Sequence, residues 1–393
     1  MNTEIKVHGL DGSLVEPDWA PLSPHEIDSV LSRYPELQGP YKIVSMSPRP
    51  LSAASVVASR SGRVFVKRHA RLVRGAEGLR EEHRFVAHLR AHGAPVPKVL
   101  ICDSGDTVIE AGGWTYEVHA IPHGVDAYED AISWTPFRSS EHARSVGETM
   151  ARLHLAAEEY DAPVRQSRHL VAGFTIFAGE NATRKLDEYV TVRPALQQYL
   201  AQTGCAHEAI DLLAPFYAEL APLLPSLQPL WTHNDLHGSN LFWSDEGPTA
   251  KATAVIDFGL CDRTNALHDL AHAIERSVVE WLSLVNDPAN PESVPVHMDH
   301  LWALIEGYET VRSLSKAERA ALAPMLALCH AEFALSETDY FLSVLHSREK
   351  AYMACEGYLV SHARWWCGPG EQVLKALRNW AAIKEPKREV HRG

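Results

Sequence analysis

A short stretch of the chain, residues 231–259, carries acidic and amide side chains at a spacing that suits chemistry on a phosphate group. His233, Asp235 and Asn240 follow the pattern H-x-D-x-x-x-x-N. An apolar run then ends in Asp257, which is followed by Phe-Gly. Aspartates are also common in ordinary turns, so one such motif alone would decide little. Two motifs in this order favour a functional site.

The two motifs flank a predicted β-hairpin. Apolar residues 241–243 and 253–256 predict two short strands, and the polar residues 245–248 predict the turn between them. The hairpin is therefore expected to bring Asn240 and Asp257 close together in space.

This set of groups is what phosphoryl transfer requires, because that reaction depends mainly on positioning and on neutralising charge. Asp235 is predicted to be the catalytic base that takes the proton of an acceptor hydroxyl. Asn240 and Asp257 are predicted to bind Mg²⁺ through hard oxygen ligands. The spacing is typical of a kinase catalytic loop followed by its D-F-G acid.

A lysine and a glutamate earlier in the chain complete the predicted nucleotide site. Lys67 alternates with Val64 and Val66 in a predicted strand, and a helix over 78–92 places Glu82 on its apolar stripe. We expect Glu82 to pair with Lys67 and hold it against the nucleotide phosphates, with Glu81 facing solvent. Taken alone, Lys67 could also be an exposed edge residue.

The remaining predicted nucleotide contacts are made by loops. The loop 47–54 would cover the phosphates, yet it contains no glycine, and its small residues would have to replace glycine there. The segment from His119 to Ile121 follows a predicted strand and is expected to bind the nucleotide base through its backbone. Residues 117–124 are the predicted hinge between two lobes.

Periodicity and turn signals predict strands first and helices afterwards. The expected strands cover 41–46, 55–59, 63–68, 98–102, 108–110 and 115–119. Helices are expected over 24–34, 78–92, 141–159, 181–203, 206–222, 267–282, 299–312, 316–345 (kinked near Pro324), 349–364 and 371–382. His154 and Asp269 are predicted to be structural, with Asp269 receiving backbone N–H groups near the catalytic loop.

Composition restricts the class of protein. The 393 residues have a net charge of −13, which argues against a nucleic-acid partner. The first residues do not resemble a secretory signal, and no apolar run approaches the roughly 20 residues of a membrane span. The 6 cysteines have no C-x-x-C spacing and predict reduced thiols in a cytoplasmic protein.

The order of motifs resembles the aminoglycoside phosphotransferase and choline kinase superfamily. The residues that carry the resemblance are V-F-V-K at 64–67, Glu82, 93–97, 146–154, H-N-D-L-H-G-S-N at 233–240, I-D-F-G at 256–259 and 268–271. It implies an α+β, protein-kinase-like fold, with a β-rich nucleotide-binding lobe (1–119) and a mainly helical catalytic and substrate lobe (120–393). It also implies Mg²⁺ with ATP or GTP as the donor, and a small-molecule hydroxyl as the acceptor.

The acceptor and the oligomeric state are left open by the sequence. Acceptors of the superfamily include amino alcohols, aminoglycosides and sugars, and the contacts are expected from helices beyond residue 265. An acidic and aromatic set could form a pocket for an amine, but such residues more often lie on solvated helix faces or in the core, so they are not assigned to the site: Glu275, Glu280, Trp281, Glu332, Asp339 and Tyr340. A Ser/Thr protein kinase of the same fold, or a nucleotide-binding regulatory module with little turnover, are the alternatives.

Overall fold

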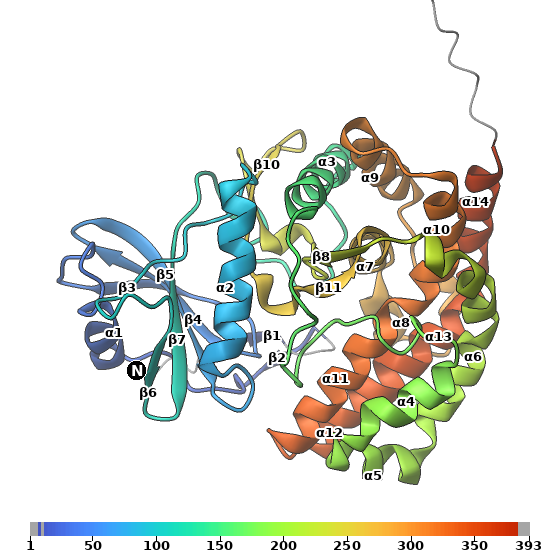
Figure 1. The fold of residues 1–393 in the computed structure, drawn as a ribbon, viewed down its shortest axis with the longest axis horizontal. Coiled ribbons are helices and arrows are strands. Elements are labelled where there is room, and N and C mark those ends of the chain that lie inside the picture. The colour runs from blue at the N-terminus through green and yellow to red at the C-terminus, as the bar shows by residue number, and fades with distance from the viewer. Residues whose placement is uncertain (1–6, 9–11, 384–393) are drawn as a thin grey trace, which may run out of the picture.

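A five-stranded antiparallel sheet forms the smaller lobe of this computed structural model, which describes residues 7–8 and 12–383 (Figure 1). The strand order is β3-β4-β5-β7-β6. The strands are β3 (Lys42–Met46), β4 (Ala53–Ser59), β5 (Gly62–Ala70), β6 (Ile109–Ala111) and β7 (Trp114–Ala120). Residues 98–102, predicted to be a strand, contribute only a single bridge from Val99 to His119.

Two helices pack against this sheet. On one face, Val64 and Val66 of β5 are buried against Ile27 and Leu31 of α1 (Pro24–Leu31). The helix α1 begins with the predicted capping box, in which Ser23 accepts from the backbone of Glu26. The helix α2 (Ala76–Ala91) lies between the sheet and the larger lobe (Figure 1).

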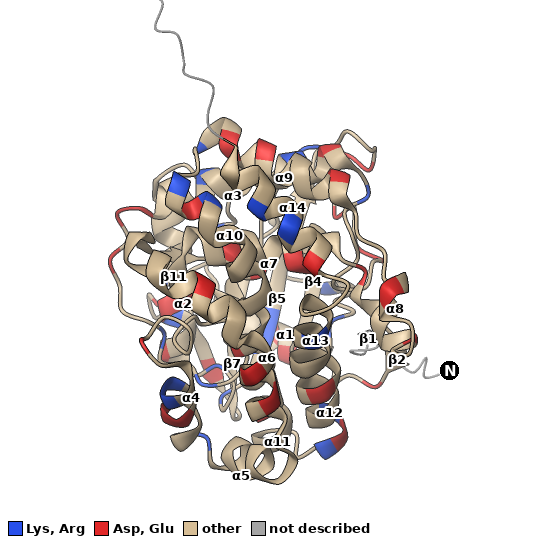
Figure 2. Cartoon of the chain, turned by 90° about the vertical axis from the view of Figure 1, so that its right-hand side faces the viewer, with Lys and Arg blue, Asp and Glu red and all other residues tan. Residues whose placement is uncertain are grey.

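The larger lobe is mainly helical, so the predicted α+β, protein-kinase-like two-lobe fold is confirmed. Its helices are α3 (Ser140–Ala157), α4 (Ala182–Thr191), α5 (Pro194–Thr203), α6 (Cys205–Leu220), α7 (Ala266–Val278), α8 (Trp281–Asn286), α9 (Met298–Val311), α10 (Lys316–Leu328), α11 (His330–Ser343), α12 (Arg348–Tyr352), α13 (Ser361–Trp366) and α14 (Glu371–Ala382). A π-helical stretch, Met353–Val360, connects α12 to α13. Acidic and basic residues are interspersed along these helices (Figure 2).

Three predicted helices are each divided in the structure. The expected helix 267–282 ends at Val278, and α8 begins at Trp281. The expected helix 181–203 breaks before Pro194, because the proline lacks an N–H and fits the first turn of a new helix. The expected helix 316–345 is also divided: α10 continues through Pro324 and ends at Leu328, and the expected kink at that proline stays a prediction. The helix α11 then begins at His330.

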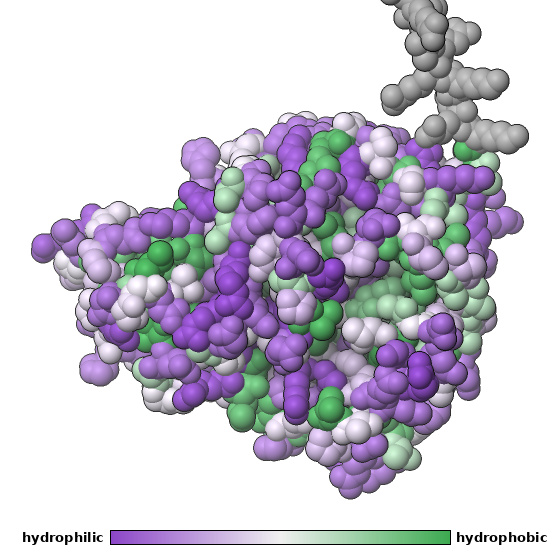
Figure 3. All heavy atoms as spheres, viewed as in Figure 1, coloured by the Kyte–Doolittle hydropathy of each residue, from purple (hydrophilic) through white to green (hydrophobic). Residues whose placement is uncertain are grey.

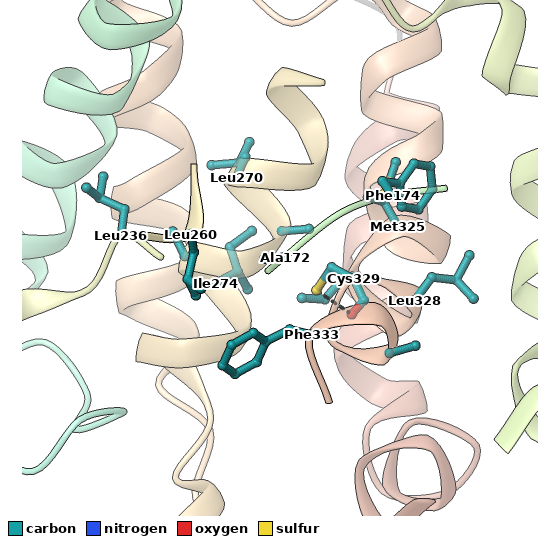
Figure 4. Packing of buried hydrophobic residues seen from close by; sticks show 14 of the residues in the cluster. Ala172, Phe174, Leu236, Leu260, Leu270, Ile274, Met325, Leu328, Cys329 and Phe333 are labelled. Atoms are coloured by element: carbon teal, nitrogen blue, oxygen red, sulfur yellow. Dashed lines mark hydrogen bonds between the residues drawn. The ribbon is translucent and has the colours of Figure 1, made fainter. Parts of the chain in front are cut away.

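The core of the larger lobe is built around α7, in which all residues are buried. Leu270 and Ile274 of α7 pack with Leu236 and Leu260, which come from the two motif segments (Figure 4). Elsewhere, α3 and α9 approach so closely that a Cβ on Gly147 would lie 2.0 Å from the carbonyl oxygen of Leu304. The outer face in Figure 3 is mostly polar, with apolar residues in separate patches.

The N-terminal segment contacts both lobes before α1 begins. The Trp19 indole packs edge-on against Trp114 of β7, with ring centroids 5.4 Å apart, and donates to the Tyr340 hydroxyl of α11 at 3.2 Å. The neighbouring Asp18 forms an ion pair with Lys350 of α12. This segment therefore crosses from the sheet to the helices.

The expectation that all cysteines are reduced is wrong. Cys205, at the start of α6, and Cys355, in the π-helical stretch, form a disulfide. The two residues are 150 positions apart, and only the packing of α6 against the π-helical stretch brings them together. Among the remaining cysteines, Cys102, Cys261 and Cys329 are buried thiols, while Cys367 is exposed.

Candidate active site

The two motif segments meet at one end of a short hairpin, as predicted. The strands β9 (Leu241–Trp243) and β10 (Ala252–Val255) are antiparallel, with Leu241 opposite Val255. The N–H of Ile256 donates to the carbonyl oxygen of Asn240 at 2.9 Å. Asn240 and Asp257 are therefore held next to each other by backbone pairing.

Strained backbone conformations concentrate around these segments. Of the five described non-glycine residues with positive φ, Asn234 (60°) and Asp257 (56°) belong to the motif segments. Trp134 (70°) and Leu170 (51°) line the same cavity as Asp257. Such conformations cost free energy and persist where the surrounding structure imposes them, which is typical of functional sites.

Asp269 fixes the loop that carries Asp235. Its carboxylate accepts from the N–H groups of His233 at 3.1 Å and Asn234 at 2.8 Å. His154 of α3 contacts the same carboxylate at 3.0 Å. The predicted structural roles of Asp269 and His154 are therefore confirmed.

Lys67 and Asp257 form an ion pair across the cleft between the lobes. The Lys67 Nζ lies 2.8 Å from Asp257 Oδ1, although the residues are 190 positions apart. Burial opposes the ionisation of Asp257, but the Lys67 ammonium outweighs it and lowers the pKa of that carboxyl to about 2. Both groups are therefore charged near neutral pH.

The expected ion pair between Lys67 and Glu82 is replaced by two others. Glu82 does point inward and is buried, but its carboxylate lies 3.5 Å from the guanidinium of the buried Arg165. Lys67 instead faces Asp257. Arg165 thus takes the place of Lys67 beside Glu82, and no motif around residue 165 predicts that it reaches α2.

Asp235 lies against an arginine that the motifs did not indicate. The Arg276 Nη1 of α7 is 2.8 Å from Asp235 Oδ1, and the Asn240 amide nitrogen donates to Asp235 Oδ2 at 3.1 Å. Burial raises the pKa of Asp235, and the positive charge of Arg276 opposes that rise. The carboxylate is thus desolvated but paired, which suits a general base.

These side chains line one cavity of about 180 Å³ between the lobes. Its lining includes Lys67, Asp235, Asn240, Asp257 and Arg276. The cavity therefore gathers the proposed base, both proposed metal ligands and the lysine.

The glycine-free loop 47–54 contributes an arginine to this cavity. Arg49 lines the cavity, and its buried Nη1 has no hydrogen-bond partner among the described residues. Burial lowers the pKa of Arg49, while the charges of Asp126, Asp235 and Asp257 act in the opposite direction. The loop thus points a buried cation at the acidic groups.

The predicted base-binding segment lies at the end of β7, outside this cavity lining. The N–H of Ala120 donates to the carbonyl oxygen of Lys98 at 2.9 Å, and the His119 ring contacts the Glu117 carboxylate at 2.8 Å. His69 and His83 reach the same Glu117 carboxylate at 2.8 Å each. Ile121 follows β7 directly. The contacts of His119 and Ile121 with a nucleotide base stay a prediction.

The model of the phosphotransferase enzyme family matches residues 52–289, which is more than half of the chain. The chain belongs to this family. Among its curated relatives, a homoserine kinase from Bradyrhizobium diazoefficiens is 28% identical over 245 residues, 62% of each chain. A homoserine kinase from Burkholderia mallei is 26% identical and covers 61% of this chain and 64% of its own. The chain thus spans under two thirds of these relatives' length.

Solved structures share the fold of this chain at low identity. A microcompartment-associated aminopropanol kinase has a TM-score of 0.58 and 17% identity, covering 91% of this chain and 99% of its own. An amicoumacin kinase, solved with AMP-PNP and Ca²⁺, has a TM-score of 0.55 and 13% identity. It covers 86% of this chain and 92% of its own.

Helices beyond residue 265 of this family member do reach the cavity, but through residues that the sequence did not single out. Arg276, Phe333 and Glu337 line it, in addition to Arg49. None of the acidic and aromatic residues first considered for an amine is part of the lining. Those residues are Glu275, Glu280, Trp281, Glu332, Asp339 and Tyr340.

A signal for the missed residues did exist in helical spacing. Arg276 lies seven residues after Asp269, on the same face of α7, and Asp269 was already expected to face the catalytic loop. Arg49 and Glu337 have no comparable signal.

Proposed function

We propose that the protein transfers the γ-phosphoryl group of ATP to a hydroxyl group of a small molecule, with Mg²⁺ as the required cation. The observation that carries the proposal is that Lys67 lies 2.8 Å from Asp257 in a cavity that also contains the carboxylate of Asp235. GTP is the alternative donor. The names of the related homoserine kinases support a small-molecule acceptor.

The residues of the cavity have chemically suitable groups for a magnesium ion. Asn240 donates its amide nitrogen to Asp235 at 2.8 and 3.1 Å, which leaves the amide oxygen as the group available to a cation. Asp257 supplies an ionised carboxylate. Bound there, Mg²⁺ would neutralise phosphate charge.

The chain's own residues would then divide the work of the reaction. Lys67 would bind the donor phosphates, with the charge of Glu82 supporting it from α2. His119 and Ile121 would bind the base through their backbone. Asp235 would accept the proton of the acceptor hydroxyl as its oxygen forms the new bond to phosphorus and the bond to the nucleoside diphosphate breaks. We place the nucleotide in residues 1–119 and the acceptor in residues 120–393, joined by the hinge 117–124.

A metabolite is favoured over a protein as acceptor by the segment that follows Gly259. Only a 3-10 turn and β11 (Asp262–Asn265) separate this glycine from the start of α7 at Ala266. A long activation loop has no room in this segment. Asn234 stands where protein kinases carry an arginine.

The test is ATP consumption over a panel of alcohols, amino alcohols, hydroxy amino acids and sugars, with wild-type and Asp235→Asn proteins. We expect the variant to lose turnover by roughly a thousandfold, because general base catalysis typically contributes about 10²–10⁴-fold. Nucleotide binding should be retained, since the base acts at the acceptor. Asp245→Asn is the matched control, because Asp245 occupies the exposed turn of the same hairpin.

Three results would count against the proposal. Unaltered turnover of Asp235→Asn would remove Asp235 from its role. Tight ATP binding without turnover of any compound in the panel would favour the regulatory module. Phosphorylation of bulk protein without any added small molecule would favour the protein kinase.

A further inference from the structure

The part of the cavity beyond Asp235 is bounded by α7, α11 and the loop before α3. Phe333 and Glu337 of α11 lie one helical turn apart, and both line it. Trp134 and Leu170 add apolar walls, and Trp134 is one of the residues with positive φ. The cavity thus combines apolar walls with one carboxyl group at its far side.

Glu337 is buried without a full set of partners. Its side chain is 2% exposed, and Oε2 has no hydrogen-bond partner among the described residues. Leaving a buried polar group without a partner costs free energy, so this carboxyl group in a cavity wall is available to a ligand. The other considered acids are already engaged; Glu332, for example, accepts from Thr175 at 2.6 Å.

The charges around Glu337 leave room for one more cation. Arg276 faces it from α7, but this guanidinium is already paired with Asp235 at 2.8 Å and lies over the Phe333 ring at 4.9 Å. Asp18 of the N-terminal segment and Asp235 of the catalytic loop add negative charge nearby. Because the positive charge of Arg276 is already paired with Asp235, an ionised Glu337 has no positively charged partner.

We propose that Glu337 receives an ammonium group of the acceptor, so that the substrates are small hydroxyalkylamines whose alkyl chain lies against Phe333 and Trp134. This assignment rests on the proposed kinase function and names the class of its acceptor. The hydroxyl of such a molecule would lie at Asp235 while its ammonium group lies at Glu337.

The proposal also predicts release of a proton when the acceptor binds. Burial raises the pKa of Glu337 to about 8, with Arg276 opposing and Asp18 and Asp235 adding to the rise. Below pH 8 the empty site therefore holds a protonated Glu337, which must lose its proton to pair with an ammonium group. Acceptor affinity should accordingly increase as the pH rises toward 8.

The test compares matched acceptors with and without an amine: 3-amino-1-propanol against 1,3-propanediol, and L-homoserine against 4-hydroxybutanoate. Above pH 8, where Glu337 is ionised, we expect wild-type kcat/KM to favour the amine in each pair by at least roughly tenfold, because the buried carboxylate stays unpaired when the other member binds. Glu337→Gln should remove this preference and leave the KM for ATP unchanged. Asp339→Asn is the control, since Asp339 is buried on the same helix but pairs with His169 and lies outside the cavity lining.

A binding measurement separates this proposal from the proposed function. Calorimetric titration of 3-amino-1-propanol into the protein with a non-hydrolysable ATP analogue, in two buffers of different ionisation enthalpy, should show proton release below pH 8. Glu337→Gln should lose both the binding and the proton release, while its thermal unfolding verifies that it is folded.

Each outcome decides one of the two proposals. Turnover of amine and amine-free acceptors at equal rates, or an amine preference that survives Glu337→Gln, overturns the role of Glu337 and leaves the kinase function standing. Amine binding that depends on Glu337 without any turnover supports the ammonium site and overturns the kinase function.

Discussion

Replacing Arg276 by glutamine should move the acidic limb of the pH–rate profile to higher pH. The Arg276 Nη1 lies 2.8 Å from Asp235 Oδ1, and burial has already raised the pKa of Asp235. Arg276 is the main opposing charge, so its removal should raise the pKa of Asp235 further. A base with a higher pKa is protonated, and inactive, over a wider range of acidic pH.

The size of the shift follows from the geometry of the pair. Two unit charges about 4 Å apart interact by about 4 kcal/mol at an effective dielectric constant of about 20. One pKa unit corresponds to about 1.36 kcal/mol, which sets an upper bound of about 3 units. Asp235 retains some contact with solvent, at 17% side-chain exposure, so we expect a shift of about 1–2 units.

The assay is kcat/KM for the acceptor between pH 5 and 10 at saturating ATP. Arg276 also acts on Glu337, so Arg276→Gln is best compared within a Glu337→Gln background and with an amine-free acceptor. Arg312→Gln is the control, because Arg312 pairs with Glu318 at 2.8 Å and lies outside the cavity lining.

A uniform loss of rate with an unmoved acidic limb would refute the reasoning. It would mean that Arg276 contributes to binding alone and does not set the protonation of Asp235. A limb that moves to lower pH would contradict the sign of the interaction.

Two further predictions concern the phosphate loop and the disulfide. Arg49→Ala should raise the KM for ATP by roughly tenfold, because a charge-assisted hydrogen bond contributes about 1.5–3 kcal/mol. Arg60→Ala, on the outer turn of the sheet, is the control and should leave the KM unchanged. Equal effects of the two changes would exclude Arg49 from the phosphate site. Cys205→Ser should lower the free energy of unfolding by about 2–4 kcal/mol in denaturant titrations, because the lost disulfide closes a loop of 150 positions. If the denaturant midpoint equals that of the oxidised wild type, the disulfide does not stabilise the fold.

The parts of the site that the sequence predicted are those fixed by local structure. Asn240 and Asp257 are neighbours because a short hairpin joins them, and a hairpin is readable from turn residues and strand patterning. The motif order predicted that Lys67 and Asp257 serve the same nucleotide site, but it predicted Glu82, and not Asp257, as the partner of Lys67.

The residues that escaped prediction reach the cavity from distant elements. Glu337 lies on α11 and Arg165 in an irregular segment, and neither has a motif around it. Glu82 pairs with Arg165 in place of Lys67 for the same reason, because Arg165 also reaches it from a distant segment. Such contacts depend on the packing of the whole lobe, which residue spacing does not encode.

The N-terminal segment connects the two lobes at a point away from residues 117–124, the hinge that we propose. Trp19 packs against Trp114 of the sheet and donates a hydrogen bond to Tyr340 of α11. One lobe can therefore rotate against the other only in ways that preserve both contacts of Trp19. Any other rotation must break one of them. Because Tyr340 and Glu337 both lie on α11, the helix that Trp19 contacts also forms part of the cavity wall.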